Sequence, residues 1–153
     1  MRTALIALSF FLSLAAAPGQ QEKKSVLLPE SEVKSLAPHF QRTFLLRIQG
    51  AWQPSEAQMQ RLKAGLSQVS SLRSVNSPPN VKIANPEKYF RQYLAVVRAG
   101  KKLIYVNAFC SAEDLPYWHS HLVTVMDGGD CFWQAWYDPI TEKFFDLSIN
   151  GRG

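Results

Sequence analysis

The second half of the chain alternates apolar and polar residues with a period of two, which is the pattern of β-strands that bury one face. The alternation is clearest on both sides of Gly100 and Lys101, a pair typical of a hairpin turn. The pattern predicts five strands, at 90–98, 103–109, 122–126, 131–137 and 143–149. Because short turns such as 138–142 connect such strands, we expect them to form an antiparallel meander.

One helix is predicted before these strands, over 56–72. Ser55 and Gln58 have the spacing of a capping box at its start. Five apolar residues recur at helical spacing and form one stripe: Met59, Leu62, Leu66, Val69 and Leu72. We expect this stripe to lie on one face of the sheet. The predicted fold class is α+β, with one main helix packed on an antiparallel sheet of about four to five strands.

The segments before this helix carry weaker signals. A short helical piece is predicted over 31–36, and Pro38 is expected to end it. Residues 43–48 predict either a buried strand or a tight connector. The polar, lysine-containing residues 18–28 predict a flexible leader, so that a single α+β domain spans 29–153.

The N-terminus has the features of a secretory signal peptide. Arg2 precedes an apolar run from Ala4 to Leu14, and the small residues at 15–17 suit cleavage before Pro18. The apolar run is shorter than the about 18 residues that a membrane-spanning helix needs. We therefore expect 1–17 to be removed and the protein to be exported to the periplasm or the cell exterior, with no membrane span.

Charged residues are divided unevenly along the chain, whose formal net charge is +5. Residues 18–102 carry 14 Lys and Arg against 5 Asp and Glu, whereas 103–153 carry 2 against 7. The basic residues are scattered, however, and the densest runs are only the pairs at 23–24 and 101–102. This distribution indicates a solvated basic surface and not a nucleic-acid interface. Such a surface could attract anionic envelope surfaces over long range.

Two cysteines stand where predicted strands meet. Cys110 follows one strand and Cys131 begins another, 21 positions further along. In an exported protein such a pair is expected to form a disulfide. In the chain-entropy model, closing a loop of this length contributes about 3 kcal/mol to stability.

The same cysteines leave two other interpretations open. With His119 and His121 they could fill a tetrahedral zinc site, although the spacing C-x8-H-x-H-x9-C matches no common zinc pattern. A reduced cysteine beside one of these histidines, oriented by Asp127 or Asp130, could act as a thiol nucleophile. We predict the disulfide, with no metal site, no cofactor and no assigned catalytic residue.

The fourth predicted strand has aromatic side chains on both faces. Trp133 and Tyr137 share one face, and Phe132 and Trp136 share the other. The main helix can cover one face; the other is either covered by the segment around Trp52 or open as a binding surface. The candidate binding surface consists of Trp133, Trp136, Tyr137, Asp127 and Asp130.

Three groups of segments form a pattern. They are Gly50-Ala51-Trp52-Gln53-Pro54, then Tyr89-Phe90-Arg91-Gln92-Tyr93 with Ile104-Tyr105-Val106-Asn107-Ala108-Phe109, and finally Asp127-Gly128-Gly129 with Phe132-Trp133, Tyr137-Asp138, Leu147 and Asn150-Gly151. Together they resemble a group of small exported bacterial proteins of uncharacterised function. The resemblance covers roughly 50–151, and the terminal DGG…FW…YD…NG pattern is its most distinctive part. It implies bacterial origin and export, and it implies no catalytic residue.

These observations favour a non-enzymatic binding or interaction module, with an unknown protein or envelope component as its partner. The reason is an excess of aromatic residues without a coherent catalytic set, since ten of the 18 aromatic residues fall in 103–153. The chain has no G-x-S-x-G, P-loop or G-x-G-x-x-G motif. The alternative function is a small hydrolase or thiol enzyme that uses a Cys–His pair.

Overall fold

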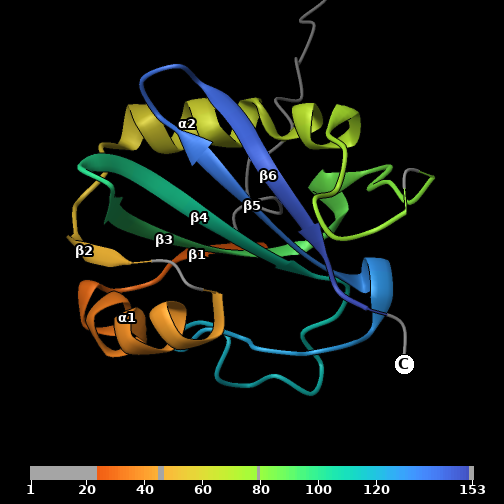
Figure 1. Cartoon of the computed structure of the whole chain (residues 1–153), viewed down its shortest axis with the longest axis horizontal. Helices are drawn as coiled ribbons and strands as arrows, with labels where there is room; N and C mark the ends of the chain where they lie inside the picture. Colours follow the sequence, from red (N-terminus) through yellow and green to blue (C-terminus); the bar gives the residue numbers. More distant parts are fainter. Residues whose placement is uncertain (1–23, 45–46, 79, 152–153) are drawn as a thin grey trace, which may run out of the picture.

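The computed structural model describes residues 24–44, 47–78 and 80–151, and within these residues six strands form one sheet (Figure 1). In chain order the elements are β1 (Ser25–Leu27), α1 (Glu30–Phe44), β2 (Ile48–Ala51), α2 (Glu56–Ala64), η2 (Leu66–Ser71), η3 (Pro86–Lys88), β3 (Phe90–Arg98), β4 (Lys101–Phe109), η4 (Gly129–Cys131), β5 (Phe132–Asp138) and β6 (Lys143–Ile149). The predicted signal peptide lies outside the described residues. None of the helices described is long and apolar enough to cross a membrane.

The four long strands β3 to β6 form the antiparallel meander that the alternation predicts. β3 and β4 are joined by Ala99 and Gly100, whose φ angles of 48° and 73° suit a tight hairpin turn. The other side of β3 is shared by two short strands, β1 running parallel to it and β2 antiparallel. The α+β class is therefore confirmed, whereas the sheet is larger than predicted and partly parallel.

Helices cover both faces of the sheet, so the prediction of a single main helix is wrong. α2 and η2 place their apolar stripe on the face that holds Trp133. α1 packs Val33 and Phe40 on the opposite face, where the ring of Phe40 meets that of Tyr105 edge-on at 5.1 Å. The result is three layers, which Figure 1 shows with α2 above the sheet and α1 below it.

α1 continues through Pro38, which was expected to end it. An internal proline costs about 3 kcal/mol because it lacks the N–H of a helical hydrogen bond. Burial of Phe40, which follows the proline, offsets much of this cost, at about 1.5–3 kcal/mol for a large apolar side chain. The strand or connector predicted at 43–48 is consequently wrong for its first two residues, which end α1. Residues 45–46 lie outside the described residues, and Ile48 begins β2.

α2 begins with the predicted capping box. The hydroxyl of Ser55 accepts a hydrogen bond from the backbone N–H of Gln58 at 3.3 Å, and Gln58 Oε1 accepts one from the N–H of Ser55 at 2.9 Å. The α-helix ends at Ala64, earlier than predicted, and a 3-10 turn continues the chain. Because this turn keeps Leu66 and Val69 in the core, the apolar stripe is confirmed although the helix changes type.

β1 lies within the segment that was predicted to be a flexible leader. Ser25 to Leu27 pair with β3, and the N–H of Leu28 donates to the carbonyl of Tyr93 at 2.9 Å. Leu28 is only 3% exposed. The sheet therefore includes residues that precede the predicted domain boundary at 29.

Side chains close the outer edge of β6. Gln68 Oε1 accepts a hydrogen bond from the N–H of Phe144 at 3.4 Å. The amide of Asn76 bonds both the N–H and the carbonyl of Ile149, each at 3.0 Å. These bonds occupy backbone groups that an open edge strand would otherwise offer to another chain.

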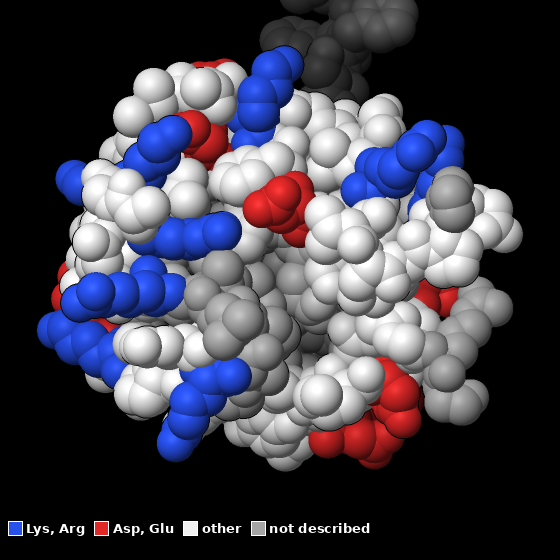
Figure 2. Space-filling model, viewed as in Figure 1, with Lys and Arg blue, Asp and Glu red and all other residues white. Residues whose placement is uncertain are grey.

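The opposite charges of the two sequence regions are separated only in part, since Arg61 pairs with Glu142 and a pocket is lined by Lys82, Lys88 and Asp130. Figure 2 shows most of the visible Lys and Arg on the left of the view, where Figure 1 places β2 and the hairpin between β3 and β4, and a smaller group at the upper right. Asp and Glu gather at the lower right, toward the loop that follows β4. The end of the sheet at the hairpin between β3 and β4 is therefore the more basic one.

Candidate binding site at the disulfide-closed loop

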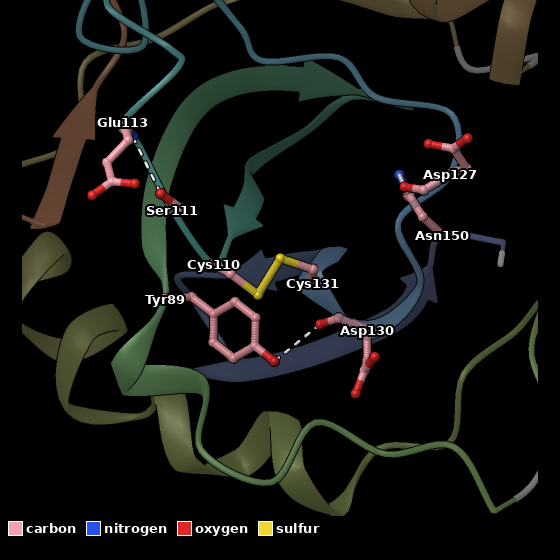
Figure 3. Close-up of a disulfide and its surroundings, with 8 residues drawn as sticks. All are labelled: Tyr89, Cys110, Ser111, Glu113, Asp127, Asp130, Cys131 and Asn150. Carbon is pink, nitrogen blue, oxygen red and sulfur yellow. Dashed lines mark hydrogen bonds between the residues drawn. A yellow bond between two sulfur atoms is a disulfide. The ribbon is translucent and has the colours of Figure 1, made fainter. Parts of the chain in front are cut away.

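The predicted disulfide is present and closes a loop at one end of the sheet. Cys110 follows β4 and Cys131 precedes β5, with their Cα atoms 5.0 Å apart. The N–H of Cys110 also donates to the carbonyl of Cys131 at 3.0 Å, and Figure 3 shows the sulfur bridge between these chain segments. We call residues 111–130 the disulfide loop. Its closure limits the paths that the loop can take, whatever its own side chains contribute.

A row of amide side chains crosses the face of the sheet beside this loop. Gln92 on β3, Asn107 on β4 and Gln134 on β5 occupy paired positions, and Asn150 follows β6. Asn107 Nδ2 donates to Gln92 Oε1 at 3.0 Å. Gln134 Nε2 donates to Asn107 Oδ1 at 3.4 Å and to Asn150 Oδ1 at 3.2 Å. We call these four residues the amide row.

The amide row holds the backbone of the disulfide loop against the sheet. Gln92 Nε2 donates to the carbonyls of Trp118 and His121, at 2.5 and 2.7 Å. Gln92 Oε1 accepts from the N–H of Val123 at 2.8 Å, and Asn107 Nδ2 donates to the carbonyl of Val123 at 2.9 Å. Since Gln92 and Asn107 are only 0% and 4% exposed, these bonds are sheltered from water.

The strand predicted at 122–126 is wrong, because this segment has no strand partner. Its backbone groups bond to side chains instead. The N–H of Leu122 donates to Glu32 Oε1 on α1 at 2.8 Å, and Asn150 donates to the carbonyl of Val125. The amide row therefore does for this segment what a neighbouring strand would do.

A small aromatic core joins the inner side of the disulfide loop to the sheet. Trp118 meets Phe90 and Phe109 edge-on, with ring centroids 5.5 and 5.9 Å apart. Val123 joins these rings and is buried as well. The inner side of the loop is thus fixed by apolar packing as well as by the amide row.

Tyr89 fastens the end of the disulfide loop. Its hydroxyl donates to the carbonyl of Asp130 at 2.9 Å (Figure 3), and its ring meets that of Trp133 edge-on at 5.7 Å. Partial burial, followed by the nearby charge of Asp130, raises the pKa of Tyr89 above its ordinary value. The hydroxyl therefore keeps its proton, and this hydrogen bond, throughout the neutral range.

The outer side of the disulfide loop presents apolar and acidic side chains to solvent. Tyr117 is 44% exposed and Met126 is 79% exposed. The exposed acidic residues of the loop are Glu113, Asp114, Asp127 and Asp130. Large apolar side chains on a rigid support suit a protein contact, because little conformational entropy remains to be lost on binding.

Two adjoining clefts lie beside the loop. The first, of about 190 Å³, is bounded by the disulfide loop and the amide row. The second, of about 380 Å³, shares Tyr105, Gln134 and Ser148 with the first and extends to Arg98 and Asp146. Aromatic, amide and hydroxyl groups thus line both clefts, and the second also has a cation and a carboxylate in its lining.

A β-bulge places Asp146 at the second cleft. The pairing of β5 with β6 shifts between Gln134 and Trp136, and Asp146 has a φ of 50°. Asp tolerates this left-handed conformation better than most residues do. Across the cleft, the guanidinium of Arg98 lies 4.8 Å from the ring centroid of Trp136. Bulges of this kind redirect side chains, and they are common beside functional sites.

The predicted aromatic surface is buried and not open. Trp133, Trp136 and Tyr137 are 0%, 4% and 1% exposed. α2 and η2 cover the face of Trp133 and Tyr137, whereas Trp136 belongs to the core beside α1. Of the five residues predicted for this surface, Asp127 and Asp130 lie on the exterior, at the end of the disulfide loop.

The sequence left the second aromatic face either covered by the segment around Trp52 or open. The segment around Trp52 does not cover it. Trp52 belongs to the core on the α2 side, and its indole N–H donates to the carbonyl of Leu103 at 3.0 Å. α1, with Val33 and Phe40, covers the face that holds Trp136.

The histidines lie on the exposed outer part of the loop. The ring of His119 lies tilted by 35° against that of Trp118, with centroids 3.9 Å apart. His121 Nδ1 lies 2.9 Å from Ser120 Oγ. In the described ranges no group of three or more His, Cys, Asp and Glu residues is placed to hold a metal ion. Both thiols that a zinc site or a thiol nucleophile would need are used by the disulfide.

Sequence reasoning missed the amide row, although a signal for it exists. Gln92 is two positions from Leu94, and Asn107 is two positions from Tyr105, so each shares a strand face with a buried residue. A polar residue at an inward position of an apolar strand must find a hydrogen-bond partner. The disulfide loop supplies those partners here.

No family model, curated protein or solved structure matches the chain. The resemblance to small exported bacterial proteins stays a prediction from the sequence. The function is therefore argued from the disulfide loop and the clefts beside it.

Proposed function

We propose that the protein is a non-enzymatic binding module, exported by a bacterium, that holds a protein or an envelope component at the disulfide loop. Export is supported by the signal-peptide features of 1–17 and by the disulfide, a bond that persists mainly in oxidising compartments. The proposed contact surface is the outer side of the disulfide loop, with Asp127 and Asp130 at its end. It replaces the aromatic strand face that the sequence suggested.

The contrast between the two sides of the loop carries this proposal. On the inner side, Gln92 alone makes four hydrogen bonds within the protein, and Trp118 is 5% exposed. Tyr117 and Met126, by contrast, extend into solvent, and Met126 also lines the first cleft. A contact surface built in this way is fixed before its partner arrives, so binding free energy is not spent on ordering it.

Affinity capture from an envelope extract tests the proposal. Tyr117→Ser combined with Met126→Ser removes the exposed apolar side chains of the loop. Ile140→Ser is the matched control, because Ile140 is 85% exposed but lies in the turn between β5 and β6. We expect the double variant to lose the partner and the control to retain it.

The expected loss is large, because truncation of a central contact residue costs about 2 kcal/mol or more, which corresponds to about thirtyfold in affinity. Circular dichroism must show that all variants fold. Equal retention of the captured partner by the double variant and by the control would contradict the proposal.

The alternative is a small hydrolase or thiol enzyme. The thiol version needs a free cysteine, and thiol counting on the denatured, unreduced protein decides it, because the disulfide leaves no thiol to count. The contact between Ser120 Oγ and His121 Nδ1 favours a serine version. Ser120→Ala would abolish ester hydrolysis if that version is correct, and it should leave partner capture unchanged if the binding module is correct.

A further inference from the structure

Four cations converge at the end of the sheet where β3 turns into β4. Arg98 and Lys101 are the last pair in the register of these strands, and Lys102 follows directly. Arg47 precedes β2, whose first residue, Ile48, pairs with Arg98. Three of the four side chains are exposed, and that of Arg98 is half-buried. We call Arg47, Arg98, Lys101 and Lys102 the basic end.

The ion pairs of the described residues include no side chain of the basic end. Among the described residues the carboxylate ion pairs are elsewhere: Glu30 pairs with Lys34, and Glu142 pairs with Arg61. Like charges that face each other on neighbouring strands destabilise a sheet, and Arg98 faces Lys101 in this way. Cations that repel one another, and that are outside the ion pairs of the described residues, suit an anionic partner.

Two tryptophans hold two of the four cations in place. The guanidinium of Arg98 lies over Trp136 on the face that α1 covers. Lys102 Nζ lies 5.5 Å from the ring centroid of Trp52, which belongs to the core of the opposite face. Such cation–π contacts restrict the long side chains, so less entropy is lost when they bind an anion.

We propose that the basic end docks on an anionic lipid bilayer through the phosphates of phospholipid headgroups. Arg98 lies over a tryptophan of the α1 face and Lys102 over one of the α2 face, so the cations are spread across the end of the sheet and do not surround one small anion. Trp52 and Trp136 are buried, and therefore offer no exposed platform on which nucleic-acid bases could stack. A planar array of phosphates matches this arrangement.

This orientation would point the disulfide loop away from the bilayer. The loop lies at the end of β4, and the basic end lies at its start. The exposed acidic residues Glu113 and Asp114 belong to the loop, and a negatively charged surface repels them. Attraction of the basic end and repulsion of these loop carboxylates would favour this orientation, whereas Lys82 and Lys88 beside the disulfide would oppose it.

Vesicle co-sedimentation tests the proposal with the protein in its exported form. The vesicles contain phosphatidylcholine either alone or with phosphatidylglycerol, at low salt. Lys101→Gln with Lys102→Gln removes two charges of the basic end. The control, Lys82→Gln with Lys88→Gln, removes two exposed cations from beside the disulfide, so the net charge falls equally.

We expect binding to the anionic vesicles only, and about thirtyfold weaker binding for the first double variant, since each cation near an anionic surface contributes about fivefold in affinity. The control should change by less than about threefold. Thermal unfolding of both variants verifies the fold. The proposal is overturned if the parent protein does not bind anionic vesicles, if both double variants lose affinity equally, or if single-stranded DNA binds more tightly than the vesicles do.

Discussion

Replacement of Gln92 by Leu removes the central member of the amide row while keeping a side chain of similar size. Gln92 bonds Asn107, the carbonyls of Trp118 and His121 and the N–H of Val123, and it is fully buried. Leu can fill the space but can make none of these bonds. The perturbation therefore separates the hydrogen bonds of the amide row from the packing around it.

The cost follows from the groups left without partners. A buried donor or acceptor that loses its partner costs about 1–3 kcal/mol. Gln92→Leu leaves the N–H of Val123 and the carbonyl of Trp118 unpaired against the sheet, so we expect a loss of about 3 kcal/mol. Because the disulfide still closes the loop, most of this loss should appear as local opening of 118–123 and not as global unfolding.

Amide hydrogen exchange measures this opening directly. A change of about 3 kcal/mol predicts exchange about 150-fold faster at the N–H of Val123, whereas amides in the centre of β4 should change far less. The matched control is Gln60→Leu on the exposed side of α2, where Gln60 bonds only Glu56. If the N–H of Val123 exchanges at the same rate in Gln92→Leu as in the parent protein, the amide row does not hold the loop.

Three further outcomes are expected. Replacing both cysteines by serine should lower the free energy of unfolding by about 3 kcal/mol in urea titrations, and an unchanged midpoint would show that closure of the loop adds nothing. Gly128 has a φ of 91°, and a Cβ there would lie 2.7 Å from the ring of Phe132. Gly128→Ala should therefore lower the stability measured by thermal unfolding by about 1–3 kcal/mol. The control Gly151→Ala, which has open space around its Cβ, should leave the stability unchanged. Burial raises the pKa of Tyr105 in the folded state, so unfolding is favoured as the pH rises above about 10, where the unfolded chain loses this proton first. Tyr105→Phe should therefore move the alkaline unfolding midpoint, followed by tyrosinate absorbance, to higher pH, and the same midpoint in both proteins would refute this.

The long strands could be predicted because each shows the alternation of apolar and polar residues within its own sequence. The alternation around Gly100 predicts the hairpin of β3 and β4, and β6 has the predicted bounds, 143–149. The capping box at Ser55 is also a local feature, read from two side chains three positions apart. The disulfide could be predicted because Cys110 and Cys131 flank strands that pair with each other.

The incorrect predictions concern segments whose conformation depends on contacts with residues far away in the sequence. Residues 122–126 have the composition of a strand, but their backbone bonds go to amide side chains from other strands and from the end of the chain. Pro38 predicts a helix end, yet the sheet beneath Phe40 favours continuation. A helix that ends at Pro38 lacks Phe40, so the sequence left the face of Trp136 either covered by the segment around Trp52 or open as a binding surface.

Hydroxyl-radical footprinting in the intact envelope tests the central claim most directly, because it works whatever the identity of the partner. The labelling of Tyr117, Met126 and Ile140 is compared between the purified protein and the protein in its native envelope; all three side chains are exposed in the free molecule. We predict that the envelope protects Tyr117 and Met126 and leaves Ile140 as reactive as before. Undiminished labelling of Tyr117 and Met126, with protection at Ile140 instead, would contradict the assignment of the disulfide loop as the contact surface.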